Sequence, residues 1–575
     1  MKMKKYLSLA IVLVLLLTTL VGCGENGSDA DVSKQGTEGG QATTQEQSNN
    51  QEIDSEQYLN VVLGAEPSTL DPSKGSDMYS NGILNNVLEP LTRLEEKEEN
   101  GNIVNFVAPA GAESWEPNED GTVWTFKIRD NMWSDGVPVR AQDYEYGIKR
   151  SVAQETASPY AFLLEPIKNA SKVNSGELPV DELGVKAIDE KTLEITLEST
   201  TPYFLSLTYQ RVTLPQRQDI VEKFGDKYGS ELDTLVYNGP FTLTKWVHNS
   251  ELVLTKNENY WDNETVKLQN INLKIIQDEN ARYNSLANGS IDSTEANRPE
   301  WREKFMADEN LRHLEIINPT TFFVFFNTQD EVFGNANIRR AFSAAISREE
   351  IANVIFNGVN VPAQGWVPPS MSIGDQEYRS IVEEPIQTLI NENPDPKALL
   401  VKGLEELGLD TNPANLTIKI SLGGTDQWFR TYGEYLQQMY NKNLGINVEI
   451  ETLDWPVFSA AAEKGDFQVG YMAWGADFND PISMLSLLKS DAGAIATGWA
   501  NERYDELINL AAKEMDQEKR LEYFKEAEKI LLYDEAALAP VVYPRSNVFR
   551  YKYVHNLGVT PFGTQGYKYA YTQGR

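Results

Sequence analysis

The sequence predicts a mixed α/β protein built from more than one domain. Its 575 residues exceed what a single hydrophobic core supports, so two or three domains are expected. In the C-terminal half, apolar segments with strand periodicity alternate with segments of helical periodicity, which is typical of βαβ units with parallel strands. A hydrophobic fraction of 41%, with 10% aromatic residues, is sufficient for globular cores.

The expected elements can be followed along the chain from a short apolar strand at residues 58–63. A helix is predicted at 79–94, an alternating strand at 124–129 and an amphipathic helix at 141–152. The second half continues this pattern, with strands at 416–421 and 446–452, helices at 426–440, 455–464, 502–515 and 517–532, and closing strands between 539 and 553.

The stretch 467–481, FQVGYMAWGADFNDP, is the part of the chain best suited to meet a ligand. It begins as a strand, breaks at Gly475 and ends in Asp480-Pro481, a helix-start pattern. Trp474 and Asp477 lie between the strand and the helix, and open α/β sheets bind ligands at the carboxyl ends of their strands. From these residues alone, a second interpretation is equally open, in which Asp477 only caps a turn and Trp474 only fills core.

Composition and residue counts argue against several classes of function. The net charge of −34 would repel phosphate backbones, so nucleic-acid binding is not expected. One cysteine, Cys23, rules out an internal disulfide framework, and three scattered histidines make a histidine-based metal site improbable. The sequence has no GxSxG, Walker A or GxGxxG motif, which weakens an enzyme interpretation.

The N-terminus reads as a targeting segment followed by a tether. Residues 1–22 combine lysines, an apolar run and the ending Leu-Val-Gly before Cys23, which resembles a bacterial lipobox. The resemblance implies cleavage before Cys23 and lipidation of its sulfur, which would anchor the protein to a membrane. The alternative is an ordinary secretory signal with an incidental cysteine. Residues 23–56 are polar and nearly lack apolar side chains, so a disordered tether is expected.

Several motifs together resemble a known family. The run 112–152 is similar to the characteristic segment of the family 5 extracytoplasmic solute-binding proteins, the oligopeptide- and dipeptide-binding components of ABC importers. The order and spacing of further motifs agree with it, namely EPSTLDP at 66–72, NGPF at 238–241, KNENYW at 256–261, TFFVFFN at 321–327 and NIRRAF at 337–342.

The resemblance implies a two-lobe clamp of the periplasmic-binding-protein type with an extra sub-domain. Two crossovers between the lobes are expected, one near Asn318 and one near Leu538. The first lobe would then consist of residues 57–78, 201–318 and 538–575, with an inserted sub-domain at 79–200 and the second lobe at 319–537.

The resemblance also implies which residues meet a peptide. A receptor for many peptides must bind what all of them share, the α-ammonium group and the backbone. By resemblance Asp477 grips the α-amino group, and two strands pair with the backbone. One strand is expected to contain Ala473, Trp474 and Gly475, and the other Glu66, Pro67 and Ser68. The aromatic walls of the side-chain pockets are expected to be Trp455 and Trp474. Tyr471 stands where the oligopeptide branch has an arginine, so the cation that meets the peptide carboxylate is left open.

These inferences favour a lipid-anchored, extracytoplasmic receptor on the outer face of a bacterial cell membrane. Its expected partners are an oligopeptide and an ABC permease, with no cofactor, no metal, no nucleic acid and a monomeric state. Three alternatives stay open: a receptor of the same fold for a nickel chelate, haem or an oligosaccharide, a peptide-pheromone receptor, and a secreted hydrolase, which the sparse histidines disfavour.

Overall fold

The computed structural model describes residues 52–99, 102–495, 497–558, 562 and 566–575. The expected leader, the lipidation site Cys23 and most of the tether lie outside these residues. The tether was expected to run to residue 56, but Asp54 is already part of the fold. Its backbone N–H donates to the carbonyl of Thr572 at 3.1 Å, and its carboxylate accepts the N–H of Gly574 at 2.8 Å.

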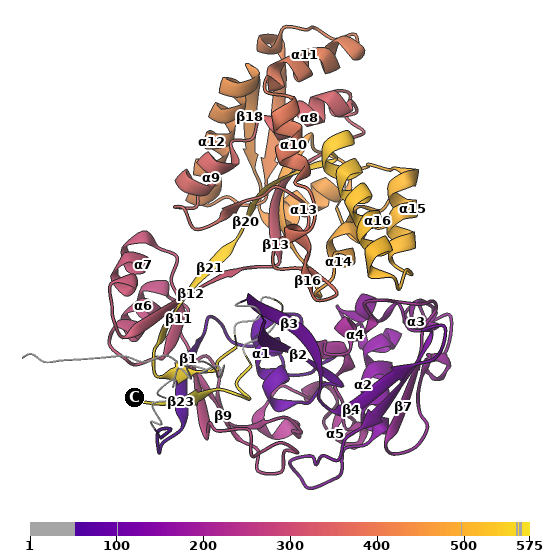
Figure 1. The fold of residues 1–575 in the computed structure, drawn as a ribbon, viewed down its shortest axis with the longest axis vertical. Coiled ribbons are helices and arrows are strands. Elements are labelled where there is room, and N and C mark those ends of the chain that lie inside the picture. The colour runs from indigo at the N-terminus through magenta and orange to yellow at the C-terminus, as the bar shows by residue number, and fades with distance from the viewer. Residues whose placement is uncertain (1–51, 100–101, 496, 559–561, 563–565) are drawn as a thin grey trace, which may run out of the picture. The chain divides into compact units, whose positions relative to one another are not determined.

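A mixed six-stranded sheet forms the centre of the second half (Figure 1). Its strands lie in the order β14 (Val361–Pro362), β20 (Leu538–Tyr543), β13 (Thr320–Phe326), β19 (Val469–Gly475), β17 (Thr417–Leu422) and β18 (Asn447–Thr452). The prediction of parallel strands is confirmed for β17 with β18 and β19. It is wrong for β20, which pairs antiparallel with β13. β13 is also antiparallel to β19, and both β13 and β20 connect directly to a neighbouring sheet without a crossover helix.

β13 is buried on both faces, as its run of aromatic residues predicts. Phe323 and Phe325 pack in one hydrophobic cluster, whereas Val324 and Phe326 pack in another. Helices contribute side chains to both clusters and cover both faces of this strand at residues 323–326, which are buried. These helices are α8 (Ala336–Ala344), α9 (Arg348–Val354), α10 (Pro385–Glu392), α11 (Pro396–Glu406), α12 (Gln427–Leu444), α13 (Trp455–Glu463), α14 (Ile482–Leu485), α15 (Glu502–Ala511) and α16 (Gln517–Lys529).

Two adjacent connections join this sheet to a three-stranded sheet of β11 (Ser293–Glu295), β21 (Arg545–Tyr551) and β12 (Leu311–Ile317). β12 continues into β13 at Asn318, and β20 continues into β21 at Pro544. The N–H of Asn318 donates to the carbonyl of Pro544 at 2.9 Å, so the two connections lie side by side. The crossover expected near Leu538 therefore follows β20 rather than preceding it, because residues 538–543 pair with β13.

The first half contributes two further four-stranded sheets. One contains β1 (Tyr58–Leu63), β10 (Asn270–Ile275), β9 (Glu251–Lys256) and β8 (Phe241–Val247), and the other β4 (Ala112–Pro117), β5 (Val123–Ile128), β7 (Thr192–Thr196) and β6 (Val185–Ala187). The second sheet lies wholly within 79–200, the range predicted for an inserted sub-domain; that domain assignment stays a prediction.

The remaining elements are short. The helices are α1 (Met78–Val87), α2 (Ala141–Val152), α3 (Ala170–Asn174), α4 (Phe204–Leu207), α5 (Gln218–Phe224), α6 (Glu279–Ala287) and α7 (Pro299–Met306). The strand pairs are β2 (Thr92–Glu99) with β3 (Asn102–Pro109), β15 (Ser372–Ile373) with β16 (Gln376–Glu377), and β22 (Val554–His555) with β23 (Tyr571–Thr572). The helix expected at 79–94 ends early because Pro90 disfavours helical backbone before it, and β2 begins at Thr92.

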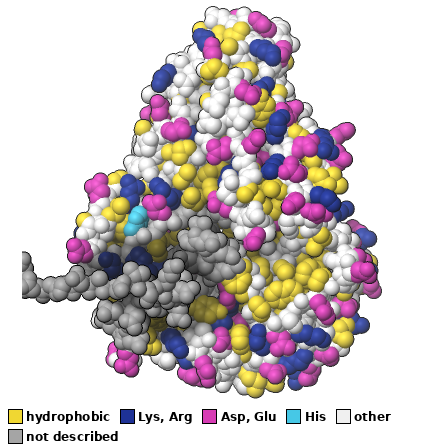
Figure 2. All heavy atoms as spheres, in the orientation of Figure 1, with side chains coloured by type: hydrophobic (Ala, Val, Ile, Leu, Met, Phe, Trp, Pro, Cys, Tyr) yellow, Lys and Arg dark blue, Asp and Glu magenta, His cyan; other side chains and the backbone are white. Residues whose placement is uncertain are grey.

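The surface is a mixture of charges. Figure 2 shows acidic side chains spread among lysines and arginines over the visible face, with no large basic area there. In the part of the chain that the structure describes, no helix is long and apolar enough to span a bilayer. Within the same residues, no group of three or more His, Cys, Asp or Glu side chains is arranged to hold a metal ion.

Candidate functional site

The loop after β19 is held firmly at both ends. β19 pairs antiparallel with β13 along its whole length, from Val469 to Gly475, and the N–H of Ala476 then donates to the carbonyl of Pro319 at 2.7 Å. At the other end, Asp480 accepts the N–H of Ile482 at 3.0 Å, as a helix-start residue should. Asp477 therefore sits on a short loop of fixed geometry at the carboxyl end of a strand.

One edge of β19 is open exactly along the residues predicted to bind a peptide backbone. β17 pairs with β19 only as far as Tyr471, so no described strand covers the β17 side of Met472–Gly475. Ala473 and Trp474 are half-buried and Gly475 is exposed. An unpaired edge of this kind can accept an extended chain by β-augmentation.

The Asp477 carboxylate is largely buried and has no partner among the described residues. Its backbone is fixed, because its N–H donates to Ser483 Oγ at 2.9 Å and its carbonyl accepts Gln210 Nε2 at 3.2 Å. The carboxylate itself takes part in no hydrogen bond or ion pair there. Burial raises the pKa of Asp477 to about 6. A desolvated carboxylate is stabilised by a cation, so this group is ready for one that the described residues do not supply.

The two predicted tryptophans differ in environment. Trp474 is half-buried and packs against the core, whereas Trp455 is 51% exposed at the start of α13. The Trp455 ring lies 5.7 Å from that of Phe458, and a Cβ at Gly423 would approach it to 2.8 Å. Trp455 is therefore not a core residue, and both rings keep surface that a ligand can contact.

Residues Glu66, Pro67 and Ser68 lie in an irregular loop after β1, not in a strand. The Glu66 carboxylate is already occupied, since it accepts Trp246 Nε1 at 2.8 Å, His248 Nδ1 at 2.7 Å and the N–H of Asn249 at 2.8 Å. The hydrogen bond to Glu66 raises the pKa of His248, with a second contribution from Glu231. The Glu66 side chain thus fixes the loop to the β8–β9 turn and leaves only backbone groups for a ligand.

Ser68 and Pro67 are fixed within the same loop. The N–H and the hydroxyl of Ser68 donate to Asp77 Oδ2 at 3.2 and 2.5 Å, while Pro67 is buried. Asp77 is also the N-cap of α1, where it accepts the N–H of Ser80 at 2.7 Å. This explains why an irregular segment can present its backbone in a defined conformation.

Three residues bear on which cation could meet a peptide carboxylate: Tyr471, Arg340 and Lys442. Tyr471 is 3% exposed and its ring packs among Phe322 and Tyr432. Arg340 lies over the ring of Tyr533, and Lys442 is exposed at 4.0 Å from Glu350. Neither cation contacts any of the predicted ligand residues.

Sequence reasoning missed the segment 203–211, which contacts the Asp477 loop. Gln210 holds the Asp477 carbonyl, and Tyr203 stacks on Phe478 with ring centroids 5.1 Å apart. Beside Gln210, Arg211 donates from Nη2 to the carbonyl of Asp77 at 2.7 Å. No local motif marks this segment, because its role depends on a contact across more than 260 positions of sequence, 267 for Gln210 and Asp477.

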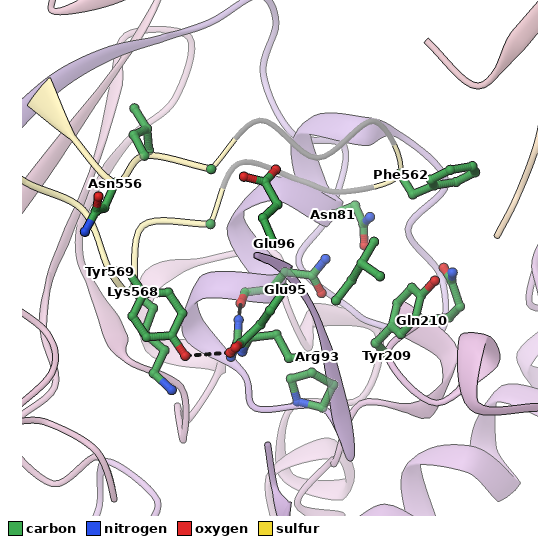
Figure 3. A pocket seen from close by; sticks show the side chains of 16 residues that line it. Asn81, Arg93, Glu95, Glu96, Tyr209, Gln210, Asn556, Phe562, Lys568 and Tyr569 are labelled. Atoms are coloured by element: carbon green, nitrogen blue, oxygen red, sulfur yellow. Dashed lines mark hydrogen bonds between the residues drawn. The ribbon is translucent and has the colours of Figure 1, made fainter. Parts of the chain in front are cut away.

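A cavity of about 570 Å³ adjoins this segment (Figure 3). Its walls come from α1, the start of β2, Tyr209 and Gln210, and the C-terminal residues that include Lys568 and Tyr569. None of the predicted ligand residues lines it. Gln210 connects the cavity with the Asp477 loop, because this residue lines the cavity and its side chain donates to the Asp477 carbonyl.

Comparison with known proteins identifies the family of the chain. The model of the bacterial extracellular solute-binding proteins, family 5 Middle, matches residues 107–495. The chain is 32% identical over 549 residues to the oligopeptide-binding protein OppA of Bacillus subtilis (strain 168), covering 94% of each protein. It is 33% identical over 490 residues to the dipeptide-binding protein DppE of the same organism, covering 85% of this chain and 87% of DppE.

A solved structure supports the fold as well as the family. Listeria monocytogenes OppA bound to peptide superimposes with a TM-score of 0.70 and 29% identity, covering 90% of this chain and 99% of that one. Its two-lobe architecture of the periplasmic-binding-protein type confirms the predicted fold class. The chain therefore belongs to the family 5 bacterial extracellular solute-binding proteins.

Proposed function

We propose that the protein is a lipid-anchored receptor on the outer face of the bacterial cell membrane, which binds oligopeptides between two lobes and delivers them to an ABC permease. Asp477 grips the α-ammonium group of the peptide. Ala473, Trp474 and Gly475 pair with its backbone along the open edge of β19, and Trp455 lines a side-chain pocket. On the other side of the peptide, residues 66–68 contribute backbone groups.

The observation that carries the proposal is the Asp477 carboxylate. It is largely buried, its pKa is raised to about 6, and it has no partner among the described residues. Such a group costs stability in the free protein and is compensated when a cation arrives. An α-ammonium group is the cation that every free peptide carries, and the adjacent open strand edge suits an extended backbone. The printed names of the relatives, an oligopeptide- and a dipeptide-binding protein, support the same ligand class.

Calorimetry with Asp477→Asn tests this role. Truncating one side of a buried charged pair costs roughly 2–5 kcal/mol, so affinity for an unmodified peptide should fall by about thirtyfold or more. Acetylating the peptide N-terminus should cost the wild type a similar factor and the variant much less, because both changes remove the same contact. Asp491→Asn, an exposed carboxylate farther along the chain, is the matched control and should bind like wild type. Fully additive losses would contradict the assignment.

The anchor and the lack of catalysis have separate tests. Cys23→Ser should release the protein from the membrane fraction into the medium, whereas retention of the variant would contradict lipidation. Peptides recovered after long incubation with the protein should be intact, because we propose no enzymatic step. Cleaved products would contradict the receptor assignment.

Closure over the ligand is expected from the two adjacent connections at Asn318 and Pro544. Paired connections of this kind allow hinge motion between two bodies. Small-angle scattering should show a smaller radius of gyration when a binding peptide is added to saturation. An unchanged radius with bound peptide would contradict a clamp while leaving peptide binding itself in place.

A further inference from the structure

The cavity of about 570 Å³ adjoins the proposed peptide site and is lined by charged and polar side chains. Gln210 forms part of its wall and donates to the carbonyl of Asp477 at 3.2 Å. A peptide whose N-terminus is held by Asp477 therefore has this cavity as a neighbour. Its volume falls in the usual range of ligand pockets, roughly 300–1,000 Å³, and exceeds what packing defects leave in a core.

The two cations that line the cavity are already neutralised by carboxylates outside its lining. Arg93 is paired with Glu89, which is fully buried and also accepts the hydroxyl of Tyr260 at 2.9 Å. Lys568 is paired with Asp262 at 2.9 Å. Neither cation is available to balance further negative charge inside the cavity.

The carboxylate of Glu95 is not paired with a cation in this way among the described residues. Glu95 lines the cavity, and its carboxylate has one partner in the described part of the chain, the hydroxyl of Tyr569 at 2.5 Å. Burial raises the pKa of Tyr569, and the neighbouring carboxylate adds to that shift, so the hydroxyl stays protonated and donates. A neutral donor leaves the negative charge of Glu95 without a paired cation among the described residues.

The opposite wall also has an unused polar group. Tyr209 is only 8% exposed, and its hydroxyl has no hydrogen-bond partner among the described residues. The hydroxyl is near Ser206 and the backbone of Asn479 but reaches hydrogen-bond geometry with neither. Figure 3 shows Tyr209 and Gln210 at one end of the cavity and the Tyr569–Glu95 hydrogen bond at the other. Buried polar groups without partners are uncommon and mark places where a ligand or water completes the bonding.

We propose that this cavity receives a lysine or arginine side chain of the bound peptide, with its charge facing Glu95. The methylene stem would lie against Pro90 and Leu94, which also line the cavity, and Tyr209 would bond to peptide or water at the end near Gln210. The inference rests on the proposed function, because the Asp477 site must hold the peptide next to the cavity. It adds a preference for basic residues at one position of the peptide.

The test is calorimetry of the full chain with alanine tetrapeptides in which one position carries lysine or norleucine. Norleucine has the same stem without the charge, so the ratio of the two affinities isolates the electrostatic contact. At one position the wild type should bind the lysine peptide about tenfold tighter, the scale of a partly enclosed ion pair. That preference should weaken as salt is raised.

Variants separate the contact from a structural effect. Glu95→Gln keeps an acceptor for Tyr569 and should abolish the lysine preference while the all-alanine peptide binds as before. Glu113→Gln, an exposed carboxylate outside the cavity, is the matched control and should keep the preference. Tyr569→Phe should also keep it, because Glu95 retains its charge.

Different results would overturn the cavity proposal and the proposed function. Equal affinity for lysine and norleucine at every position, with good binding of the all-alanine peptide, would overturn this inference and leave the proposed function standing. The same holds if the preference survives in Glu95→Gln. If no peptide binds, the all-alanine one included, both proposals fail.

Discussion

The loop after β19 and the loop after β1 each carry a carboxylate that the sequence predicts to be near a ligand, yet the two are in opposite states. Glu66 accepts three hydrogen bonds from Trp246, His248 and Asn249. Asp477 accepts none among the described residues, and burial raises its pKa to about 6. The difference shows that readiness for a ligand depends on the donors that the fold brings to a carboxylate, not on its position after a strand.

Asp480 completes the comparison, three positions beyond Asp477. It is 5% exposed and bonds through both oxygens to Arg520, at 2.6 and 2.7 Å. Burial alone therefore does not make a carboxylate a ligand site. Asp480 is paired with Arg520 and holds the loop, whereas Asp477 is buried with no cation beside it in the part of the chain that the structure describes.

The largest effect expected is on folding, from Asp480→Asn. Removing one charge of a buried pair leaves Arg520 uncompensated and should lower the free energy of unfolding by about 3–5 kcal/mol. Asp491→Asn breaks an exposed pair with Lys489 and should cost no more than about 1 kcal/mol. Urea denaturation measures both, and equal losses would contradict the distinction between the two carboxylates.

Asp477→Asn, in contrast to Asp480→Asn, should raise the free energy of unfolding of the peptide-free protein. The pKa of Asp477 is about 6 in the folded state and about 3.9 in the unfolded state. Protonation of Asp477 therefore stabilises the fold, fully so below about pH 3.9. This stabilisation is lost as pH rises through 6. The variant should therefore be more stable than wild type by about 1–2 kcal/mol at pH 8 and equal to it near pH 4. A destabilised variant at pH 8 would mean that Asp477 has a favourable partner without ligand.

Peptide binding should carry the same pH dependence. The α-ammonium group binds the ionised form of Asp477, so wild-type affinity should fall about tenfold between pH 7 and pH 5. Calorimetry in buffers of different ionisation enthalpy should detect proton release on binding near pH 6. Asp477→Asn should show neither effect, and the persistence of both in the variant would assign the titration to another group.

The smallest effect is expected from Glu66→Gln. Its side chain positions the loop, so peptide affinity should change by less than about threefold, the scale of a weak, partly exposed contact. The variant should lower the pKa of His248 toward its ordinary value, which NMR titration of the imidazole can follow. A histidine whose pKa is raised in the folded state stabilises the fold below its unfolded pKa, and this stabilisation is lost as pH rises through its folded pKa. Glu66→Gln should therefore lower the free energy of unfolding only at acidic pH. A thirtyfold loss of affinity would make Glu66 a direct ligand contact.

Local sequence patterns determined the elements whose signals lie within a few residues. The alternating stretch expected at 124–129 became β5, and the amphipathic helix Ala141–Val152 has the expected bounds. The aromatic motif at 321–327 lies in the largely buried strand Thr320–Phe326. The end of β19 at Gly475 and the start of α14 just after Asp480-Pro481 are equally local, because turn and cap residues act on adjacent backbone groups. The family assignment followed from the order of such motifs.

Only the tertiary structure decided which polar groups are satisfied. The donors to Glu66 lie 180 and more positions away along the chain, Arg520 reaches Asp480 across 40, and Gln210 reaches the Asp477 loop across 267. Likewise, β20 joined the sheet of β13 because strand pairing is a non-local contact that no periodicity encodes. Hydrogen bonds and desolvation act through space, so a sequence can name a carboxylate but the folded chain decides whether it is a structural ion pair, a positioning group or an open site for a cation.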